Sequence, residues 1–427
     1  MIGLSKRGLF STAAWVGVVV VISGFSMFGS QADASSSSPN ASFVPSCQSA
    51  AGGLAVHDPE FEPHAMLATW QKDPIVDNKG LVQEPGSVYI APVDPFTGVI
   101  LTGSQTVFAS TNPAPSGLTK NGPEWGCAQS GCSAYFTSYT TSGTNVRLGK
   151  ISKAASAWTV SFLPQGDNKG SPVVTLDFAS ADPALLYYVN TTGDFKQGTF
   201  AQSNFGERAD TGTPKDTRLP LAVGSGRWVP GKKQLAANVT IVSGSTTKQQ
   251  IRLLDAITGR SEIVATDLIV ADIIVTPFPW QAPEFGGATA IVMQMSSTTG
   301  SAQTLRVYRK NNWGAWTIYN TITPPDPAYP VLWSAEPFVF GGHSYLSFAA
   351  YQGLSGGRPT GSSQIWIASV DPALSPAIRR KVSVDSNSAK NDPETLAVAN
   401  GSRVVIYYLD KGTSDSPEDL KLCQTGL

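Results

Sequence analysis

Apolar and polar residues alternate in short runs along most of the chain, and long stretches with helical periodicity are absent. The runs are rich in Val, Ile, Tyr, Phe and Thr, which favour β-strands. Seven of these runs recur at similar distances, at residues 64–70, 133–139, 184–190, 234–241, 288–295, 343–351 and 403–409. The pattern therefore predicts an all-β protein built from repeated units.

We take the seven runs above as the second strand of each unit. A third strand follows in five of the units, in "SVYIAPVD", "NVRLGKIS", "QIRLLDA", "TLRVYRK" and "QIWIASVD". Two of these runs end in D-x-x-T-G, at Asp94–Gly98 and Asp255–Gly259, and Asp371 begins a degenerate copy. Aspartate hydrogen-bonds within its own turn and glycine supplies a positive φ, so this motif predicts a reverse turn. The runs "WTVSF" and "WTIYN" are then expected to be outer strands.

A motif of proline, glutamate and an aromatic residue also recurs. It reads "HDPEF" at 57–61, "NGPEWG" at 121–126, "QAPEFGG" at 281–287, "SAEPFVFGG" at 334–342 and "NDPET" at 391–395. Weaker copies contain Pro172 and Pro230. Counted from Pro59, the successive prolines lie 64, 49, 58, 53, 54 and 56 residues apart. This period is near that of a four-stranded β-propeller blade.

Seven units predict a single β-propeller with seven blades of four antiparallel strands, and six blades with one degenerate end is the alternative. The last unit, residues 393–427, is too short for four strands. We expect the segment around Cys47 to supply the missing outer strand. Closing the ring in this way removes a sheet edge that would otherwise invite aggregation.

The motif resembles the WD40-like repeat of TolB-type propellers, in which Pro-x-aromatic is followed by a glycine and by a strand ending in Phe or Tyr. The second unit carries this pattern in Pro123-x-Trp125, Gly131 and Phe136. The Ser-Pro-Asp-Gly turn of those repeats is absent from this sequence. The resemblance extends over most of residues 57–425 and implies the propeller fold.

In a propeller the first strand of each blade pairs on one side only, so a proline there removes no ladder hydrogen bond. The aromatic residue is expected to pack between adjacent blades. The acidic residues of the motif would lie near one mouth of the central channel, and they are Asp58, Glu60, Glu124, Glu284, Glu336, Asp392 and Glu394. We favour a structural clamp, in which each glutamate accepts hydrogen bonds from backbone N–H groups of the next blade. An acidic pocket for catalysis or a metal ion is the alternative.

The composition narrows the function classes. Only 14% of the 427 residues are charged and the formal net charge is −1, so there is no electrostatic basis for nucleic-acid binding. The sequence has no Gly-rich phosphate loop, HExxH motif or EF-hand loop. "GLSGG" at 353–357 matches G-x-S-x-G, but it sits in a Gly-rich loop rather than between a strand and a helix, so we expect no hydrolase triad.

Residues 1–34 predict a signal peptide, because Lys6 and Arg7 precede an apolar run that ends before the small residues "ADA". An uncleaved membrane anchor is the alternative, since the run is long for a cleaved signal. Residues 35–46 predict a flexible spacer and residues 47–427 the propeller domain. We therefore expect an exported protein, extracellular or in the cell envelope, with no membrane span after signal removal.

Four cysteines in an exported chain predict two disulfides. Cys127 and Cys132 flank the turn-like segment "AQSG", which favours a local bridge between them. This pairing leaves Cys47 with Cys423, and that bond would tie the two ends of the domain together. Free buried thiols are the alternative.

Three connections between second and third strands are long, at residues 71–87, 352–363 and 410–419. They belong to blades that are adjacent around a seven-fold ring, and loops carry binding function on rigid scaffolds. This arrangement predicts a ligand-binding crescent on the same face as the glutamates. Its candidate residues are Lys72, Asp77, Glu84, Arg358, Asp410 and Asp415.

We therefore expect a monomeric, non-catalytic binding module for an extracellular glycan or surface protein, without a cofactor. The alternative is a glycoside hydrolase, because arabinanase-like propeller glycosidases are similar in placing their carboxylates at the start of inner strands. Its candidate catalytic residues are Asp58, Glu60, Glu124 and Glu394. A Ca²⁺ ion bound structurally in the channel is a further alternative to a site without metal.

Overall fold

The structure is a computed structural model. It describes residues 43–427 apart from internal gaps at 52–56, 73–74, 77–81, 85, 112–122, 140–145, 155–156, 163–168, 182–184, 191–196, 203–220, 244–245, 256–257, 259, 269–276, 296–302, 356–357, 375–376 and 413–418. The chain divides into two compact units, and all described residues belong to the second, Ser42–Leu427. The expected signal peptide, 1–34, and most of the spacer, 35–46, lie outside the described residues. Within the described ranges, no helix has the length and apolar character that crossing a membrane requires.

The strands form a series of antiparallel sheets, which we number along the chain. Sheet 1 contains β2 (His57–Glu62), β3 (Leu67–Lys72), β6 (Gly86–Pro92) and β7 (Thr106–Thr111). Sheet 2 contains β8 (Glu124–Ala128), β9 (Gly131–Tyr139), β10 (Val146–Ala154) and β11 (Ala157–Phe162). Sheet 3 contains β12 (Lys169–Val174), β13 (Leu185–Asn190) and β14 (Gln197–Gln202).

The second half of the domain continues the series. Sheet 4 contains β15 (Leu221–Trp228), β16 (Gln234–Ser243), β17 (Thr246–Asp255) and β18 (Ser261–Leu268). Sheet 5 contains β19 (Phe278–Ala282), β20 (Ala288–Met295), β21 (Thr304–Lys310) and β22 (Trp316–Ile322). Sheet 6 contains β23 (Val331–Phe340), β24 (His343–Ser355), β25 (Arg358–Ser369) and β26 (Arg379–Lys381). Sheet 7 contains β27 (Lys390–Val398), β28 (Arg403–Asp410), β29 (Asp419–Gln424) and β1 (Cys47–Ser49).

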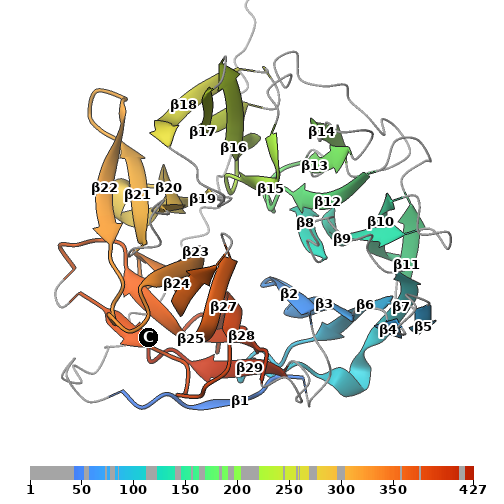
Figure 1. The fold of residues 1–427 in the computed structure, drawn as a ribbon. Helices are drawn as coiled ribbons and strands as arrows, with labels where there is room; N and C mark the ends of the chain where they lie inside the picture. Colours follow the sequence, from blue (N-terminus) through green and yellow to red (C-terminus); the bar gives the residue numbers. More distant parts are fainter. Residues whose placement is uncertain are drawn as a thin grey trace, which may run out of the picture. The chain divides into compact units, whose positions relative to one another are not determined.

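The sheets form a closed ring with their first strands innermost (Figure 1). Each first strand contacts the next in the order β2, β8, β12, β15, β19, β23 and β27, and β27 contacts β2 again. The domain is therefore an all-β propeller, as the sequence predicted. Among the described residues, six sheets of the ring have the expected four strands, so a count of six complete blades fits the fold. The described part of sheet 3 adds a three-stranded seventh member to the ring.

Sheet 7 joins the two ends of the domain. Its outermost strand, β1, pairs antiparallel with β29, and Cys47 lies opposite Cys423 in this register. The two cysteines form a disulfide across 376 residues of sequence. The second predicted disulfide, between Cys127 and Cys132, is also present. Both disulfide predictions are confirmed.

Aromatic side chains of the first strands connect neighbouring sheets. The ring of Phe61 in sheet 1 stacks on Tyr407 in sheet 7, with 4.1 Å between the ring centroids. The indole N–H of Trp125 in sheet 2 donates to a backbone carbonyl of β2 at 3.3 Å, and that of Trp228 in sheet 4 donates to a carbonyl of β12 at 2.9 Å. A fully buried aromatic side chain contributes about 1.5–3 kcal/mol, so these contacts hold adjacent sheets together.

The D-x-x-T-G turns have the predicted geometry. The Asp94 carboxylate accepts hydrogen bonds from the backbone N–H groups of Phe96 and Thr97, and Gly98 has a φ of 80°. These backbone donors hold the pKa of Asp94 below its ordinary value. Asp255 accepts the equivalent bond from Thr258 at 2.8 Å.

Two of the predicted long loops are partly β-structure. Strands β24 and β25 extend to Ser355 and Arg358, which lie opposite each other, so the prediction of a long connection at 352–363 was wrong: most of that range continues the two strands. Ser355 is followed by a strand and not by a helix, which excludes a nucleophile elbow. The connection in sheet 1 contains a small hairpin of β4 (Ile75–Val76) and β5 (Val82–Glu84).

Candidate functional site

The first strands of sheets 1, 6 and 7 share a β-bulge. The register shifts lie between His57 and Glu60, between Trp333 and Glu336, and between Asn391 and Glu394. Two positions before each glutamate the backbone takes a positive φ, of 52° at Asp58, 45° at Ser334 and 57° at Asp392. Such bulges re-aim the side chains around them, and they are found next to functional sites. The same device thus positions an acidic side chain in three of the sheets.

Six acidic side chains and one arginine form the candidate site, which we call the central cluster. Its members are Asp58 and Glu60 in sheet 1, Glu124 in sheet 2, Arg227 in sheet 4, Glu336 in sheet 6, and Asp392 and Glu394 in sheet 7. All seven residues are partly exposed. The cluster is carried by the innermost strands of the ring (Figure 1).

The carboxyl groups of the cluster share protons. The side chains of Glu336 and Glu394 are hydrogen-bonded to each other, as are those of Asp392 and Asp58, and two carboxyl groups make such a bond only when one of them holds a proton. Carboxylate oxygens of Glu336, Asp392 and Glu394 all lie within 4.8 Å of one another. Like charges at this distance cannot all be ionised, so protons or a cation must compensate them.

Burial raises the pKa of the glutamates in the cluster, and nearby carboxylates raise it further. The pKa of Glu124 and that of Glu336 are raised to about 7. Glu60 and Glu394 also have a pKa well above the ordinary value, for the same two reasons. Near neutral pH the cluster therefore contains both protonated and ionised carboxyl groups, which can donate and accept protons.

Arg227 partly neutralises these charges. Its guanidinium lies 3.8 Å from the carboxylate of Glu124 and packs over the ring of Phe278 in sheet 5, 4.8 Å from the ring centroid. Burial alone would lower the pKa of Arg227, but the surrounding carboxylates raise it above its ordinary value. The same cation lowers the pKa of Glu124 and Glu336. The side chains of Arg227 and Glu124 are 22% and 14% exposed, so the pair is reachable from solvent.

A metal ion is the other way to balance the acidic side of the cluster. Glu336, Asp392 and Glu394 each offer a carboxylate oxygen, the ligand type that Ca²⁺ and Mg²⁺ take in proteins. An ion there would displace the shared protons, because both compensate the same negative charge.

Glu284 does not belong to the cluster, and the prediction that it would was wrong. It lies in the 3-10 helix η2 (Pro283–Phe285), which follows the first strand of sheet 5 instead of beginning it. Its carboxylate accepts a hydrogen bond of 2.8 Å from the hydroxyl of Ser344 in sheet 6, and that hydroxyl also accepts one from Trp280. Glu284 thus links one sheet to the next through a side chain. The described contacts of Glu336 and Glu394 are with each other and with the charged groups around them.

The structure brings together all four candidate catalytic residues, Asp58, Glu60, Glu124 and Glu394. Of the expected crescent, Lys72 ends β3, Arg358 begins β25 and is exposed, and Asp410 ends β28. Asp77 and Asp415 lie outside the described residues, as does the side chain of Glu84. A ligand-binding role for the crescent stays a prediction.

Sequence reasoning missed Arg227. The motif was aligned on its proline, and in "GRWVP" that choice draws attention to Pro230 instead of Arg227. The sequence does point to Arg227, which stands directly before a tryptophan. The order "RW" repeats that of "EW" at Glu124–Trp125 and of "EF" at Glu60–Phe61.

We expect the melting temperature to fall as the pH rises from 5 to 7. Glu124 and Glu336 have a pKa of about 7 in the folded protein, against an ordinary value of 4.5. The folded state binds more protons than the unfolded state between these values, so its stability falls as the pH rises. Replacing both residues by glutamine should reduce the fall in melting temperature between pH 5 and pH 7 by about 2–6 °C. Calorimetry at several pH values measures this change, with Glu262→Gln as a partly exposed control. An unchanged pH dependence in the double variant would contradict the assignment.

No protein-family model matches the chain, and no curated protein does. Among solved structures, the chain is similar to the β-propeller domain of the Trilobed protease from Pyrococcus furiosus, with 10% identity and a TM-score of 0.48, over 88% of this chain and 94% of that one. It is also similar to an endo-arabinase from Bacteroides thetaiotaomicron, with 10% identity, a TM-score of 0.35 and coverage of 60% and 93%. For the sialidase from Trypanosoma rangeli the values are 9%, 0.42, 87% and 55%, so this chain spans about half of that protein.

Proposed function

We propose that the protein is an exported β-propeller that binds a neutral glycan at the central cluster. One observation carries the proposal: six carboxyl side chains and Arg227 gather on the innermost strands and are partly exposed. Carboxylates accept hydrogen bonds from sugar hydroxyls, and a guanidinium donates to them. The ring of Phe278 beside Arg227 adds the apolar surface on which a sugar ring packs. The negative charge of the cluster disfavours anionic ligands.

Two features support the export part of the proposal. The apolar run within residues 1–34 follows two basic residues, as in signal peptides. Both cysteine pairs of the described domain form disulfides, which persist in oxidising compartments outside the cytosol. The site would then meet extracellular or envelope glycans, and the ring needs no second copy to assemble it.

Hydrolysis of a glycosidic bond at this site is the second candidate function. The observation that favours it is the pKa of about 7 for Glu124 and Glu336, because a general acid must still be protonated near neutral pH. Glycoside hydrolases need a second carboxyl group nearby as base or nucleophile, and the cluster provides several.

One set of variants tests both functions. Neutral oligosaccharides are titrated into the protein by calorimetry, and the mixtures are then analysed for shortened products. We expect Glu124→Gln and Glu336→Gln each to weaken binding at least about tenfold, because hydrogen bonds to charged groups are lost. If the protein is a hydrolase, each should also lower the rate about 10²–10⁴-fold.

Glu262→Gln is the matched control, since Glu262 is a partly exposed glutamate of sheet 4 that pairs with Lys310 of sheet 5 at 2.8 Å. Binding that is equal in all the variants would contradict a site at the central cluster, and so would the absence of binding to every neutral oligosaccharide. Binding without product formation would retain the binding function and exclude hydrolysis of the sugars used.

A further inference from the structure

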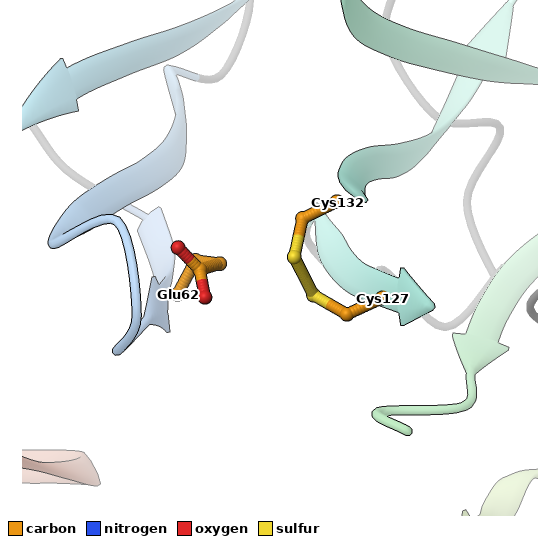
Figure 2. Close-up of side chains that lie close together, drawn as sticks. All are labelled: Glu62, Cys127 and Cys132. Carbon is orange, nitrogen blue, oxygen red and sulfur yellow. A yellow bond between two sulfur atoms is a disulfide. The ribbon is translucent and has the colours of Figure 1, made fainter. Parts of the chain in front are cut away.

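Reactive side chains also gather outside the central cluster, and one such group is structural. Glu62 of β2 faces the disulfide between Cys127 and Cys132 of sheet 2 (Figure 2). Both carboxylate oxygens of Glu62 accept backbone hydrogen bonds, from His64 at 2.9 Å and Ala65 at 2.6 Å, and the two sulfur atoms are bonded to each other. These groups fix the turns after β2 and β8, so we assign no reaction to them.

A second group surrounds Lys390, the first residue of β27. Its side chain is completely buried, whereas lysine is almost never fully buried in proteins unless it is paired. The Nζ atom lies 3.1 Å from the carbonyl oxygen of Ser363 and 3.4 Å from that of Ser388. The hydroxyl oxygen of Ser386 is closer, at 2.6 Å. The described hydrogen-bond partners of Nζ are therefore oxygen atoms of neutral groups.

A neutral lysine amine fits these three partners. It has two N–H groups and one lone pair, and its surroundings offer two carbonyl oxygens, which only accept, and one hydroxyl group, which can donate. The N–H groups would bond to the carbonyls of Ser363 and Ser388, and the lone pair would accept the O–H of Ser386. The Ser386 oxygen would in turn accept the hydroxyl of Ser388, 2.6 Å away. Every donor then has an acceptor, and the proton of Ser386 points at a basic nitrogen.

The charges around Lys390 are compatible with this neutral form. Burial lowers the pKa of Lys390, and the cation of Lys381 at the end of β26 lowers it further. The carboxylates of Asp410 in β28 and of Asp385 oppose this effect. Asp385 is paired with Lys381 at 2.6 Å, which compensates part of its charge. The balance is a lowered pKa, as a lysine that acts as a base requires.

The segment that carries Ser386 is fixed from two sides. The carbonyl of Ser388 accepts the backbone N–H of Ser363 in β25 at 3.1 Å, and the carbonyl of Ala389 accepts that of Lys411 at 2.8 Å. Ser386 itself is exposed. A nucleophile and its base lie within about 2.6–3.2 Å of each other in enzymes, and serine with lysine is one such combination. The structure thus holds an accessible hydroxyl against a buried base.

We propose that Ser386 is a nucleophile activated by Lys390, and that the pair hydrolyses carboxylic esters reached from solvent. The Ser386 oxygen bonds to the carbonyl carbon of the ester, and its proton passes to Nζ of Lys390. The bond from this carbon to the alcohol oxygen then breaks, and Lys390 gives the proton to the departing alcohol. Water next attacks the acyl group and passes a proton through Lys390 to the Ser386 oxygen, which releases the carboxylic acid. This activity does not depend on the function of the central cluster.

A fluorophosphonate and p-nitrophenyl acetate test the proposal, because both react with activated serines. We expect the full-length protein to gain one phosphonyl group, which peptide mass spectrometry locates on Ser386, and to release p-nitrophenol. Ser386→Ala should lose the label and lower the release of p-nitrophenol at least about 10²-fold. Ser386 is exposed, so this replacement leaves the core unchanged, and the melting temperature would verify it.

Ser261→Ala is the matched control. Ser261 is also exposed, and its hydroxyl accepts a bond of 3.1 Å from Arg252, a cation that does not act as a base. We expect no label on Ser261 and unchanged release of p-nitrophenol from Ser261→Ala. The absence of a label on Ser386 would overturn the proposal, as would equal ester hydrolysis by Ser386→Ala and Ser261→Ala.

Lys390→Arg tests the base separately, because arginine keeps the positive charge but does not take up a proton. We expect Ser386 to be labelled about 10²–10⁴-fold more slowly in this variant. An unchanged labelling rate would overturn the role of Lys390. The two serine variants decide the role of Ser386 even where the larger arginine side chain prevents folding.

Discussion

Replacing Cys47 and Cys423 together by serine should lower the free energy of unfolding by about 2–5 kcal/mol. The disulfide closes a loop with a sequence separation of 376 residues, so it removes a large amount of conformational entropy from the unfolded chain. It also fixes β1 to β29, and β1 is paired to the rest of the domain through only three residues. We expect the melting temperature to fall and urea unfolding to begin at a lower concentration.

The second disulfide provides the control for this experiment. Cys127 and Cys132 are 5 residues apart, so their replacement by serine releases a much shorter loop. We therefore expect a smaller loss of stability from that pair, measured under the same conditions. An equal or larger loss would show that the bond between β1 and β29 is not what holds the ring closed.

Replacing Arg227 by methionine should destabilise the protein in a pH-dependent way. The methionine keeps much of the apolar contact with Phe278 but removes the cation that lowers the pKa of Glu124 and Glu336. Their pKa then rises further, and the folded state must bind more protons. We expect a loss of about 1–3 kcal/mol at pH 8, where these carboxyls would otherwise ionise, and little loss at pH 5.

Arg227→Lys distinguishes charge from shape in this position. Lysine keeps the positive charge, so most of the stability at pH 8 should return, whereas the planar donors of arginine are lost. Neutral oligosaccharide binding should therefore remain weak in Arg227→Lys even where stability is restored. A loss that is the same at pH 5 and pH 8 would mean that Arg227 acts through packing alone.

The fold was accessible from the sequence because local and global signals agree in this chain. The run at 288–295 coincides with β20, and the run at 403–409 coincides with β28 except for one residue at its end. Apolar residues such as Val405 and Tyr407 are buried there because second strands pack between sheets on both faces. Second strands therefore read as near-continuous apolar runs, whereas outer strands such as β26, with the sequence "RRK", carry little apolar signal.

The site was less accessible, because a short motif does not reveal where it lies on a strand. "PEF" at 283–285 and "PEF" at 59–61 read alike, but the first is a helical turn after β19 and the second lies within β2. The difference comes from the bulge at Asp58 and its pairing with β3, which is a tertiary property. The convergence of Glu60 with Glu336 likewise depends on ring geometry, which residue spacing alone does not give.

Sheet 7 combines strands from both ends of the domain, and this arrangement determines when the ring can close during synthesis. One of its strands is made at the beginning of the domain and the other three at its end. While the ribosome is still adding sheets 2 to 6, β1 has no partner and β2 lacks its neighbour β27. No closed ring can therefore exist before almost the whole chain has been released. If the proposed export takes place during synthesis, the ring can close only on the far side of the membrane, after the last three strands have crossed it.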